Sequence, residues 1–399
     1  MVLEKNHSTI QALIEITDYL KTAIDEKKIV SGIFLDLTKA FDTVNHNILL
    51  AKLHNYGIRG VANDLLRSYL TNRYQYVSIG NTSSSKQPIK CGVPQGSVLG
   101  PLLFLIYIND IANCSKIGKI RIFADDTSAF VEGTKVNEVI SNSEILMNDL
   151  NNWFKSNKLT LSTNKSCFIL FRSAHTRLNE IPSVLNFGDS HINRENSVKY
   201  LGITLDENLN WNEHVQQVCK SLKRCFGTFY NVRNYLNLDQ VRTIYYSLVY
   251  SKIKYALAVY GNTSNENIQL IQCLQNKLIK VLMKKNYRYP TYKLHNELNI
   301  LKVEDLVDQE ILTFVFNFIN KKLPNVFSSY FKYRSENQQP QTRNIDNHLI
   351  TPKPRTNCGE QTIRVKGALL WNKLPTSLTK LTNSKTFRKT WKESKPEYT

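Results

Sequence analysis

The spacing of apolar residues changes along the chain, and this spacing predicts where helices and strands lie. Apolar residues recur at helical spacing in residues 8–20 and 136–156, which predicts amphipathic helices there. Weaker helical patterns cover residues 48–56, 63–69 and 98–111. Short apolar runs between turn residues predict strands at residues 31–37, 74–80, 86–92, 117–123, 127–132, 167–172 and 198–205.

The character of the pattern changes near Trp211. Residues 1–210 alternate helical and strand patterns, whereas residues 211–332 read almost entirely as helix. A polar, proline-containing stretch at residues 333–358 predicts a linker, and a short segment at residues 359–399 follows it. The chain is therefore predicted to have an α+β fold in its first half and a helical second half.

The charge of the chain restricts its partners. A formal net charge of +19 over 399 residues, with a pI near 9.5, favours a large polyanion as partner, because neutralised phosphates release counterions. Nucleic acid is the first partner that this charge suggests. The alternative is a basic soluble protein that does not bind nucleic acid.

The cysteines and the longest apolar run restrict the compartment. The seven cysteines are scattered and contain no C-x-x-C pair, which indicates reduced thiols and neither a disulfide framework nor a zinc site. The apolar run at residues 98–108 is too short to cross a bilayer and contains Gly100 and Pro101. We expect no membrane association and a location in the nucleus, the cytoplasm or both.

Three carboxylates stand in apolar surroundings. Asp36 lies within FLDL at residues 34–37, and Asp125 and Asp126 lie between two predicted strands, where they would repel each other without a cation. Three carboxylates on neighbouring strand ends suit Mg²⁺, which prefers carboxylates together with substrate phosphates. A lone aspartate in this setting is more often a helix cap or a surface residue, and a lone pair is an ordinary turn.

A glycine-rich turn precedes the apolar helix predicted at residues 98–111. In CGVPQGSVLGPLLF (residues 91–104), Gly92 and Gly96 allow the backbone to approach a ligand closely, and Gln95 is a neutral donor and acceptor for a sugar or a base. The N-terminus of the helix favours phosphate. The alternative is that the glycines serve only the steric needs of a strand-to-helix corner.

Taken together, these motifs resemble those of a known family. FLDLTKAFDTVNH (residues 34–46), GVPQGSVLGPLLF (92–104) and FADDTSAF (123–130) resemble, in order and spacing, the central motifs of reverse transcriptases of non-LTR retrotransposons, of the LINE type and jockey-like. LTLSTNKSCFILF (159–171) and VKYLGITLD (198–206) continue the resemblance, and motifs near the C-terminus extend it over nearly the whole chain. The resemblance implies an enzyme, an RNA-directed DNA polymerase with a right-hand palm.

The resemblance also assigns roles to individual residues. It implies that Asp36, Asp125 and Asp126 bind two Mg²⁺ ions, for which Mn²⁺ could substitute. Around them it places an aromatic gate that excludes ribonucleotides, a contact to the incoming nucleotide, a lysine near the leaving pyrophosphate, and a primer grip. In that order these residues are Phe41; Gln95 with Gly96; Lys165; and Tyr200, Leu201 and Gly202. A surface lysine and a plain hairpin core are the alternatives for the last two sets.

The same resemblance implies an organisation and a set of partners. The expected parts are the palm with partial fingers (1–210), a helical thumb (211–265), a helical C-terminal region (266–332), a polar linker (333–358) and a C-terminal segment (359–399). In the thumb, the basic and aromatic stretch at residues 219–260 would follow the phosphates of an RNA–DNA hybrid, or would be an ordinary amphipathic helix. The expected partners are an RNA template, a DNA primer and deoxynucleoside triphosphates.

The chain departs from the family at its start. Before His7, Ser8 and Thr9, the family has a segment with an arginine that grips the triphosphate, and Glu4 stands near that place. We expect an N-terminally truncated polymerase, without an endonuclease domain in this chain. The alternative is a catalytically inactive remnant that only binds nucleic acid, whereas a telomerase-type or intron-maturase enzyme is disfavoured by the transposon-like C-terminal motifs.

Overall fold

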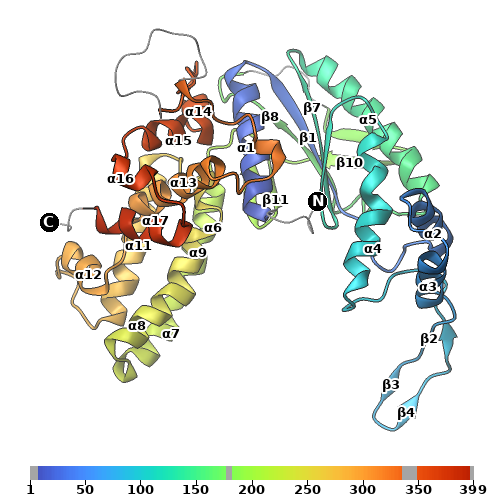
Figure 1. Cartoon of the computed structure of the whole chain (residues 1–399), viewed down its shortest axis with the longest axis horizontal. Coiled ribbons are helices and arrows are strands. Elements are labelled where there is room, and N and C mark those ends of the chain that lie inside the picture. The colour runs from blue at the N-terminus through green and yellow to red at the C-terminus, as the bar shows by residue number, and fades with distance from the viewer. Residues whose placement is uncertain (1–7, 177–181, 335–347, 396–399) are drawn as a thin grey trace. The chain divides into compact units, whose positions relative to one another are not determined.

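The computed structural model describes residues 8–176, 182–334 and 348–395 of the chain, so Glu4 and His7 lie outside the described residues. The described chain forms two compact units, labelled by element in Figure 1. The first comprises residues 28–176 and 182–196, and the second comprises residues 8–27, 197–334 and 348–395. Strands and helices share the first unit and helices dominate the second, so the predicted α+β class is confirmed. The predicted five-part division stays a prediction.

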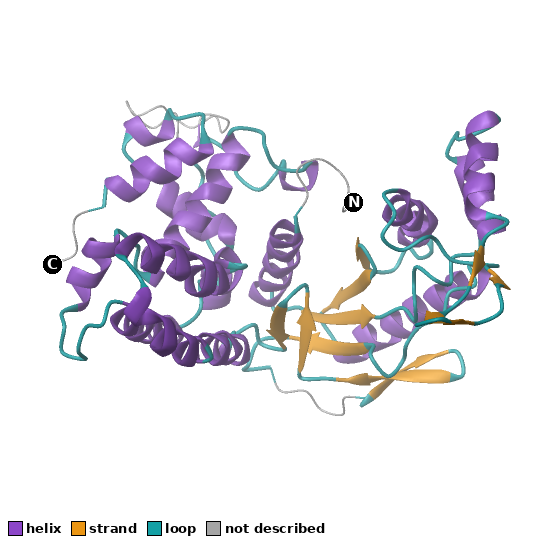
Figure 2. Ribbon diagram, turned by 90° about the horizontal axis from the view of Figure 1, so that it is seen from below, coloured by secondary structure: helices purple, strands orange, loops and turns teal. Residues whose placement is uncertain are grey.

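The first unit is built on a six-stranded sheet, drawn in orange in Figure 2, with the strand order β6-β7-β1-β8-β10-β9. All neighbouring strands are antiparallel except β8 and β10, which run parallel. The central strand β1 is completely buried, as its apolar sequence IVSGIFL requires. The strand bounds are β1 (Ile29–Leu35), β6 (Lys119–Phe123), β7 (Asp126–Gly133), β8 (Cys167–Phe171), β9 (Val184–Phe187) and β10 (Ser190–Arg194).

Helices complete the core of this unit. The long helix α5 (Val136–Ser156) packs on β1, β7 and β9, and α2 (His46–Asn55) packs on both α3 (Val61–Leu70) and α4 (Leu99–Ile108). Fully buried side chains from the sheet and these helices form one apolar cluster, among them Ile33, Leu49, Phe104, Leu146 and Phe168. The cluster holds β1 rigidly, which matters because β1 leads directly to Asp36.

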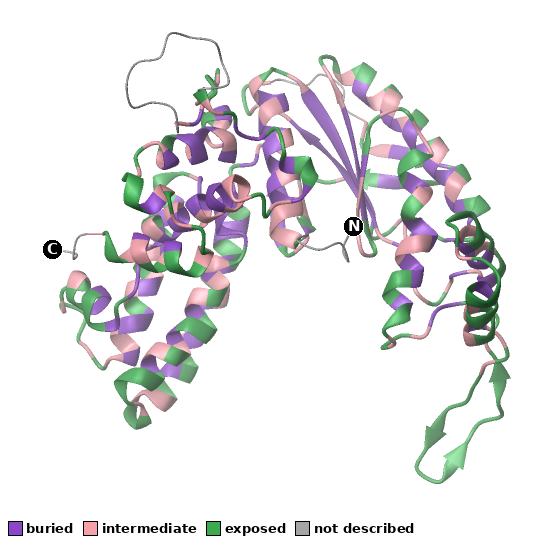
Figure 3. Cartoon of the chain, in the orientation of Figure 1, coloured by how far each residue is buried: buried purple, intermediate pink, exposed green. Residues whose placement is uncertain are grey.

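A thin extension leaves the core between α3 and α4. It consists of two short antiparallel pairs, β2 (Tyr74–Gln75) with β5 (Gln87–Pro88) and β3 (Ser78–Ile79) with β4 (Thr82–Ser83). Its residues are exposed, as the green colouring in Figure 3 shows. The predicted strands at residues 74–80 and 86–92 were therefore too long, because no apolar layer covers them and only isolated residue pairs meet the ladder geometry.

Other predicted elements shift at their ends. The helix at residues 136–156 is confirmed, whereas the helix predicted at 98–111 ends at Ile108 and continues as a 3₁₀ helix, η1 (Asn109–Asn113). Strand β1 ends one residue before Asp36, and Asp126 is the first residue of β7 and not part of a turn. Strands β9 and β10 were not predicted, since their sequences are short and half polar.

The second unit contains a hairpin and packed helices. The hairpin joins β11 (Ser197–Tyr200) to β12 (Ile203–Asp206), and the next helices are α6 (Asn212–Lys223), α7 (Cys225–Val232), η2 (Arg233–Tyr235), α8 (Leu238–Ile244), η3 (Tyr245–Tyr250), α9 (Ser251–Lys254) and α10 (Leu257–Tyr260). After them come α11 (Asn265–Leu282), α12 (Thr291–Leu298), α13 (Val303–Ile319) and η4 (Asn325–Phe327). This confirms the predicted helical character of residues 211–332. Helix α11 packs on α6, α7, α12 and α13.

The C-terminal segment joins this unit through α13 and α1. Its helices are α14 (Asn357–Glu360), α15 (Ile363–Trp371), α16 (Thr376–Thr379) and α17 (Ser384–Glu393), of which α15 and α17 pack on α13. Helix α1 (Thr9–Asp25), which also belongs to this unit, contacts α14 and α15.

Buried polar groups fix α1 to the C-terminal segment. Asp18 Oδ1 accepts from the Ile363 amide at 2.9 Å, and Lys21 Nζ donates to the Gln361 carbonyl at 3.2 Å. The Asp25 carboxylate accepts from the Thr356 amide at 2.7 Å. Burial raises the pKa of Asp18 to about 6. The C-terminal segment is therefore an integral part of the second unit.

No helix in the described ranges is long and apolar enough to span a membrane.

Candidate active site

The three carboxylates gather where β1 ends and the β6–β7 hairpin turns. In the antiparallel pairing of β1 with β7, Leu35 lies opposite Thr127. Asp36, which follows Leu35, and Asp126, which precedes Thr127, therefore lie at the same end of the two strands. Asp126 pairs with Phe123 of β6, and Ala124 and Asp125 form the tight turn between them. Ala124 has a φ of 54°, a left-handed conformation that costs an L-residue on the order of 1–2 kcal/mol. The hairpin thus accepts backbone strain where it presents Asp125.

The carboxylates interact electrostatically. Partial burial of Asp126, together with the negative charges of Asp125 and Asp36, raises the pKa of its carboxyl. A raised pKa of this origin means that a cation brought to the cluster would lower the free energy of the ionised form. The donor set is of the hard oxygen type that Mg²⁺ prefers.

Lys165 supplies a cation to this cluster. Its Nζ lies 3.5 Å from Asp36 Oδ2, and both side chains remain substantially exposed to solvent. The family resemblance implies a place for Lys165 near the leaving pyrophosphate, whereas its ion pair with Asp36 was not predicted. The pair shows that a positive charge can reach the carboxylates from the loop before β8.

Backbone contacts fix this loop against Asp36. The Asp36 amide donates to Ser166 Oγ at 3.0 Å, and the Ser162 amide donates to the Asp36 carbonyl at 2.8 Å. The Ser166 hydroxyl in turn donates to the Ser162 carbonyl at 2.9 Å. Asp36 is thereby held on both sides of its peptide unit, and Lys165 is kept beside it.

The carboxylates by themselves do not form a complete metal site. Over residues 8–176, 182–334 and 348–395, no three histidine, cysteine, aspartate or glutamate side chains are grouped so that they could hold a metal ion. The chemistry of Asp36, Asp125 and Asp126 fits divalent cations, since all three are carboxylates whose charges act on one another. Substrate phosphates supply the remaining ligands of such ions in phosphoryl-transfer sites.

The glycine-rich turn lies against the segment that follows Asp36. Gln95 Nε2 donates to Asp42 Oδ1 at 2.8 Å, so Asp42 fixes the orientation of the Gln95 amide. Asp42 was missed in the sequence, although its place next to Phe41 in AFDTVNH was a signal. Phe41 packs its ring against Phe104 of α4, with ring centroids 4.8 Å apart.

The two glycines of this turn have different reasons to be glycine. Gly92 has a φ of 88°, and a Cβ there would lie 2.8 Å from the Asp42 carbonyl oxygen. The close approach that we predicted for a ligand is therefore made by the chain's own backbone. Gly96 also has a positive φ, 78°, but a Cβ there would meet nothing within 4 Å.

The residues predicted to form the primer grip belong to the second unit. Tyr200 is buried at the end of β11, and Leu201 and Gly202 form the hairpin turn with φ values of 44° and 82°. The Tyr255 hydroxyl donates to the Leu201 carbonyl at 2.6 Å, and its ring lies 3.0 Å from the place of a Cβ on Gly202. Tyr255, which sequence analysis did not single out, thus supports the turn.

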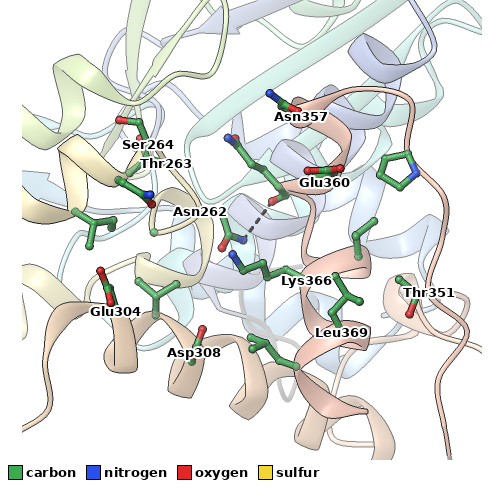
Figure 4. Close-up of a pocket in the computed structure, with 18 of the residues that line it drawn as sticks. Asn262, Thr263, Ser264, Glu304, Asp308, Thr351, Asn357, Glu360, Lys366 and Leu369 are labelled. Atoms are coloured by element: carbon green, nitrogen blue, oxygen red, sulfur yellow. Dashed lines mark hydrogen bonds between the residues drawn. The ribbon is translucent and has the colours of Figure 1, made fainter. Parts of the chain in front are cut away.

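The second unit also contains a pocket of about 1330 Å³ (Figure 4). The loop before α11, the face of α13 with Glu304 and Asp308, and helices α14 and α15 with Glu360 and Lys366 line it. Asn262 Nδ2 donates to the Gln361 carbonyl at 3.2 Å, while its buried Oδ1 has no hydrogen-bond partner among the described residues. None of the residues predicted for catalysis lines this pocket.

A protein-family model covers the first half of the chain. The model of the family "Reverse transcriptase (RNA-dependent DNA polymerase)" matches residues 1–205, about half of the chain. This range contains the carboxylate cluster, the glycine-rich turn, Lys165 and the three residues predicted for the primer grip.

Similar proteins come from fly transposons. A probable RNA-directed DNA polymerase from transposon BS of Drosophila melanogaster is 27% identical over 327 residues, which cover 76% of this chain and 34% of the relative. The RNA-directed DNA polymerase from mobile element jockey of the same species is 27% identical over 309 residues, which cover 75% of this chain and 33% of the relative. The chain thus spans about one third of the length of these relatives.

A solved structure gives a weaker likeness. Telomerase from Candida albicans, in complex with a fragment of telomeric RNA, aligns with a TM-score of 0.44 at 10% identity, over 75% of this chain and 55% of that chain. The assignment therefore rests on the family match and on the transposon relatives. With its motifs, its mixed antiparallel-rich sheet and its match over residues 1–205, the chain belongs to the reverse transcriptase (RNA-dependent DNA polymerase) family.

Proposed function

We propose that this chain catalyses RNA-directed DNA synthesis, in which a nucleotide is transferred from a deoxynucleoside triphosphate to the 3′-hydroxyl of a DNA primer on an RNA template. The observation that carries the proposal is the meeting of Asp36, Asp125 and Asp126 at the end of β1 and the β6–β7 turn, inside the region that matches the family.

The roles of the carboxylates follow from their charge. Asp36 and Asp125 would be the principal metal ligands, with Asp126 completing the acidic set, and the raised pKa of Asp126 supports a demand for positive charge there. Two Mg²⁺ ions, or Mn²⁺ in their place, would activate the primer hydroxyl and balance the charge of the triphosphate.

Lys165 would act on the leaving group. Its ammonium is close to the cluster and solvent-accessible, so it could leave Asp36 and donate a hydrogen bond or a proton to the pyrophosphate oxygen. The loop contacts that fix Asp36 beside Ser162 and Ser166 would keep this amine within reach of Asp36 and of a pyrophosphate at the cluster.

The nucleotide contacts would come from the glycine-rich turn and from Phe41. The amide of Gln95, oriented by Asp42, would contact the incoming nucleotide, and the open space at Gly96 would admit it closely. Phe41, backed by Phe104, would form a wall that a 2′-hydroxyl cannot pass.

The primer end would be held by the β11–β12 hairpin. Tyr200, Leu201 and Gly202 would position it, with the turn held open by the Tyr255 hydroxyl. The structure of the turn makes the Leu201 backbone rigid, which a positioning role requires.

A second candidate function is nucleic-acid binding without catalysis. The ion pair of Lys165 with Asp36 and the absence, within the described ranges, of three grouped ligands favour it. The charge of +19 serves either function equally, because both need a polyanion.

Primer extension on poly(rA) with an oligo(dT) primer and Mg²⁺ separates the two. We expect extension by the wild-type chain and its loss in an Asp125→Asn/Asp126→Asn variant. Asp189→Asn, an exposed carboxylate in the β9–β10 turn, is the matched control and should extend normally. Equal signal from the wild type and the double variant would refute catalysis by these carboxylates.

We also propose a reducing, intracellular location for the protein. All seven cysteines lie in the described ranges and none forms a disulfide, and two of them, Cys167 and Cys225, are buried thiols. Fractionation of cells that express a tagged chain would test the location.

A further inference from the structure

Two segments of the second unit lack acidic residues altogether. Residues 214–238 contain four lysines and arginines and no aspartate or glutamate, and residues 267–296 contain six and likewise none. The first segment runs through α6, α7 and η2, and the second through α11 and α12. Because α11 packs directly on α6 and α7, the positive charges of both segments add on one part of the unit.

The two segments meet at the end of α11. Lys284 Nζ donates to the carbonyl of Asn234 in η2 at 3.5 Å, which ties the last turn of α11 to the connection between α7 and α8. Lys280 Nζ donates to the Tyr287 carbonyl at 2.6 Å and holds the following loop against the helix. These contacts place Tyr235, next to Asn234, and Tyr287 at the same end of the unit.

Large aromatic rings stand exposed at this end. Tyr235 is 85% exposed and Tyr287 is 78% exposed, and Tyr230 of α7 is half exposed. The end of α7 and the start of α8 carry much exposed surface in Figure 3. These rings do not contribute to the packed core, whereas most tyrosines of a folded domain bury part of their ring surface.

Cations orient the rings. The guanidinium of Arg233 lies 4.5 Å from the centre of the Tyr230 ring, and that of Arg288 lies 5.3 Å from the centre of the Tyr287 ring. Arg288 Nε also donates to the Tyr287 hydroxyl at 2.7 Å. The rings of Tyr230 and Tyr287 are thus each held by an arginine, which reduces the entropy lost when a flat ligand stacks on them.

We propose that the surface formed by Tyr230, Arg233, Tyr235, Lys284, Tyr287 and Arg288, here called the tip surface, binds single-stranded nucleic acid. Bases stack on Tyr235 and Tyr287, and phosphates lie along Lys284, Arg233 and Arg288. Three of these six residues, Lys284, Tyr287 and Arg288, lie beyond residues 219–260. The stacking function proposed for the rings is not one that a helix following duplex phosphates needs.

The choice of a single strand follows from the exposed rings. A duplex presents phosphates to a basic surface but keeps its bases stacked inside, so tyrosines would add little to its binding. Unpaired bases offer their faces, and stacking on aromatic side chains is the usual way in which proteins hold them. An acidic protein partner would pair with the cations but would not require the exposed rings. Single-stranded RNA and DNA share this chemistry, so the tip surface is expected to bind both.

The inference stands apart from the proposed polymerase activity. Nothing in it requires Asp36, Asp125 or Asp126, which belong to the first unit. A chain that fails in primer extension can still bind through the tip surface, and a chain with an altered tip surface can still extend a primer at saturating concentration.

Fluorescence anisotropy with labelled oligo(rU) and oligo(dT) of about 16 nucleotides, and with a blunt DNA duplex of similar length, tests the proposal on the full chain. Tyr235→Ala/Tyr287→Ala should weaken binding of both single strands about tenfold for each ring removed. Tyr235→Phe/Tyr287→Phe keeps the rings and should bind as the wild type does.

Two further measurements localise the effect. Lys284→Gln/Arg288→Gln should lower the slope of log K against log salt by about 1.4 for single strands, at about 0.7 for each lost phosphate contact. Tyr56→Ala removes another exposed tyrosine, in the first unit, and should change nothing. Far-UV circular dichroism checks that the variants are folded.

Three results would overturn the proposal. The alanine variant could bind single strands as tightly as the wild type does, or the phenylalanine variant could lose as much as the alanine variant. The duplex could also bind as tightly as the single strands and weaken equally in the alanine variant, which would make the tip surface a site for duplex DNA.

Discussion

Replacement of Gly92 by alanine tests how the glycine-rich turn is held against the segment after Asp36. The new Cβ would lie 2.8 Å from the carbonyl oxygen, 2.9 Å from the Cα and 3.0 Å from the carbonyl carbon of Asp42, all of them backbone atoms. Backbone cannot rotate away as a side chain can. The Gly92 amide also donates to the Val44 carbonyl at 2.8 Å, and the Val93 amide donates to the Phe41 carbonyl at 2.8 Å, so the two segments resist separation.

Two terms add to the cost of this change. An L-residue at the φ of 88° costs about 1–2 kcal/mol relative to glycine. Overlap with a close-packed backbone adds about 1–3 kcal/mol, as overpacking does in protein cores. We therefore expect the free energy of unfolding of the first unit to fall by roughly 2–4 kcal/mol, after a small gain from the stiffer unfolded chain.

Gly96→Ala is the matched control. Gly96 has a similar φ of 78°, but nothing lies within 4 Å of the Cβ position, so only the conformational term applies, at about 1–2 kcal/mol. Hydrogen exchange of the amides of residues 92 and 93, which bridge the two segments, reports the opening free energy locally. Alanine at residue 92 should speed their exchange by one to two powers of ten beyond the effect at residue 96, at about 1.4 kcal/mol for each. Equal effects at the two positions would refute the steric argument.

Three other changes test the site and its support. Asp42→Ala removes the hydrogen bond that orients the Gln95 amide, so the KM for the incoming nucleotide should rise about tenfold. Stability should fall little, because both side chains are exposed. An unchanged KM in primer extension would show that Gln95 does not need this hydrogen bond. Lys165→Met should slow nucleotide incorporation about 100-fold. The melting temperature should stay within about 2 °C, because the ion pair of Lys165 with Asp36 is exposed. An unchanged rate in single-turnover assays would show that Lys165 has no catalytic role. Burial raises the pKa of Asp18 from 3.8 to about 6, so its contribution to stability is fully present below pH 3.8 and is lost as the pH rises through about 6. That loss amounts to about 3 kcal/mol, and Asp18→Asn should flatten the corresponding slope in urea unfolding measured between about pH 4 and 7; an unaltered slope would contradict the assignment.

The elements that could be predicted from the sequence are those whose own pattern determines them. The helix at residues 136–156 has an apolar stripe long enough to exclude other readings, and its predicted ends match α5. Strands β9 and β10 contain only four and five residues, and β10 gains its place through parallel pairing with β8. That pairing depends on tertiary context, which local periodicity does not contain.

The candidate site divides in the same way. The three carboxylates could be predicted to converge, because each breaks an apolar pattern and their motifs occur in a known order. Asp42 and Tyr255 could not, since each acts through one hydrogen bond to a residue more than 50 positions away, Gln95 and Leu201 respectively. For Gly92 the sequence left two roles open, and the structure supports the steric one, because its Cβ position faces the Asp42 backbone. A positive φ is visible in the sequence only as a glycine and does not say what lies opposite.

The position of Lys165 joins the structure of the site to its proposed chemistry. Lys165 is paired with Asp36, and a move of its ammonium toward the leaving pyrophosphate would lengthen that ion pair. With the lysine 74% and the aspartate 42% exposed, water replaces much of the lost contact, and opening costs less than about 1 kcal/mol. Such a cost is small against any chemical barrier. The exposed pair is therefore compatible with a mobile lysine, whereas a buried pair of the same length would have tied it to the carboxylate and excluded the role.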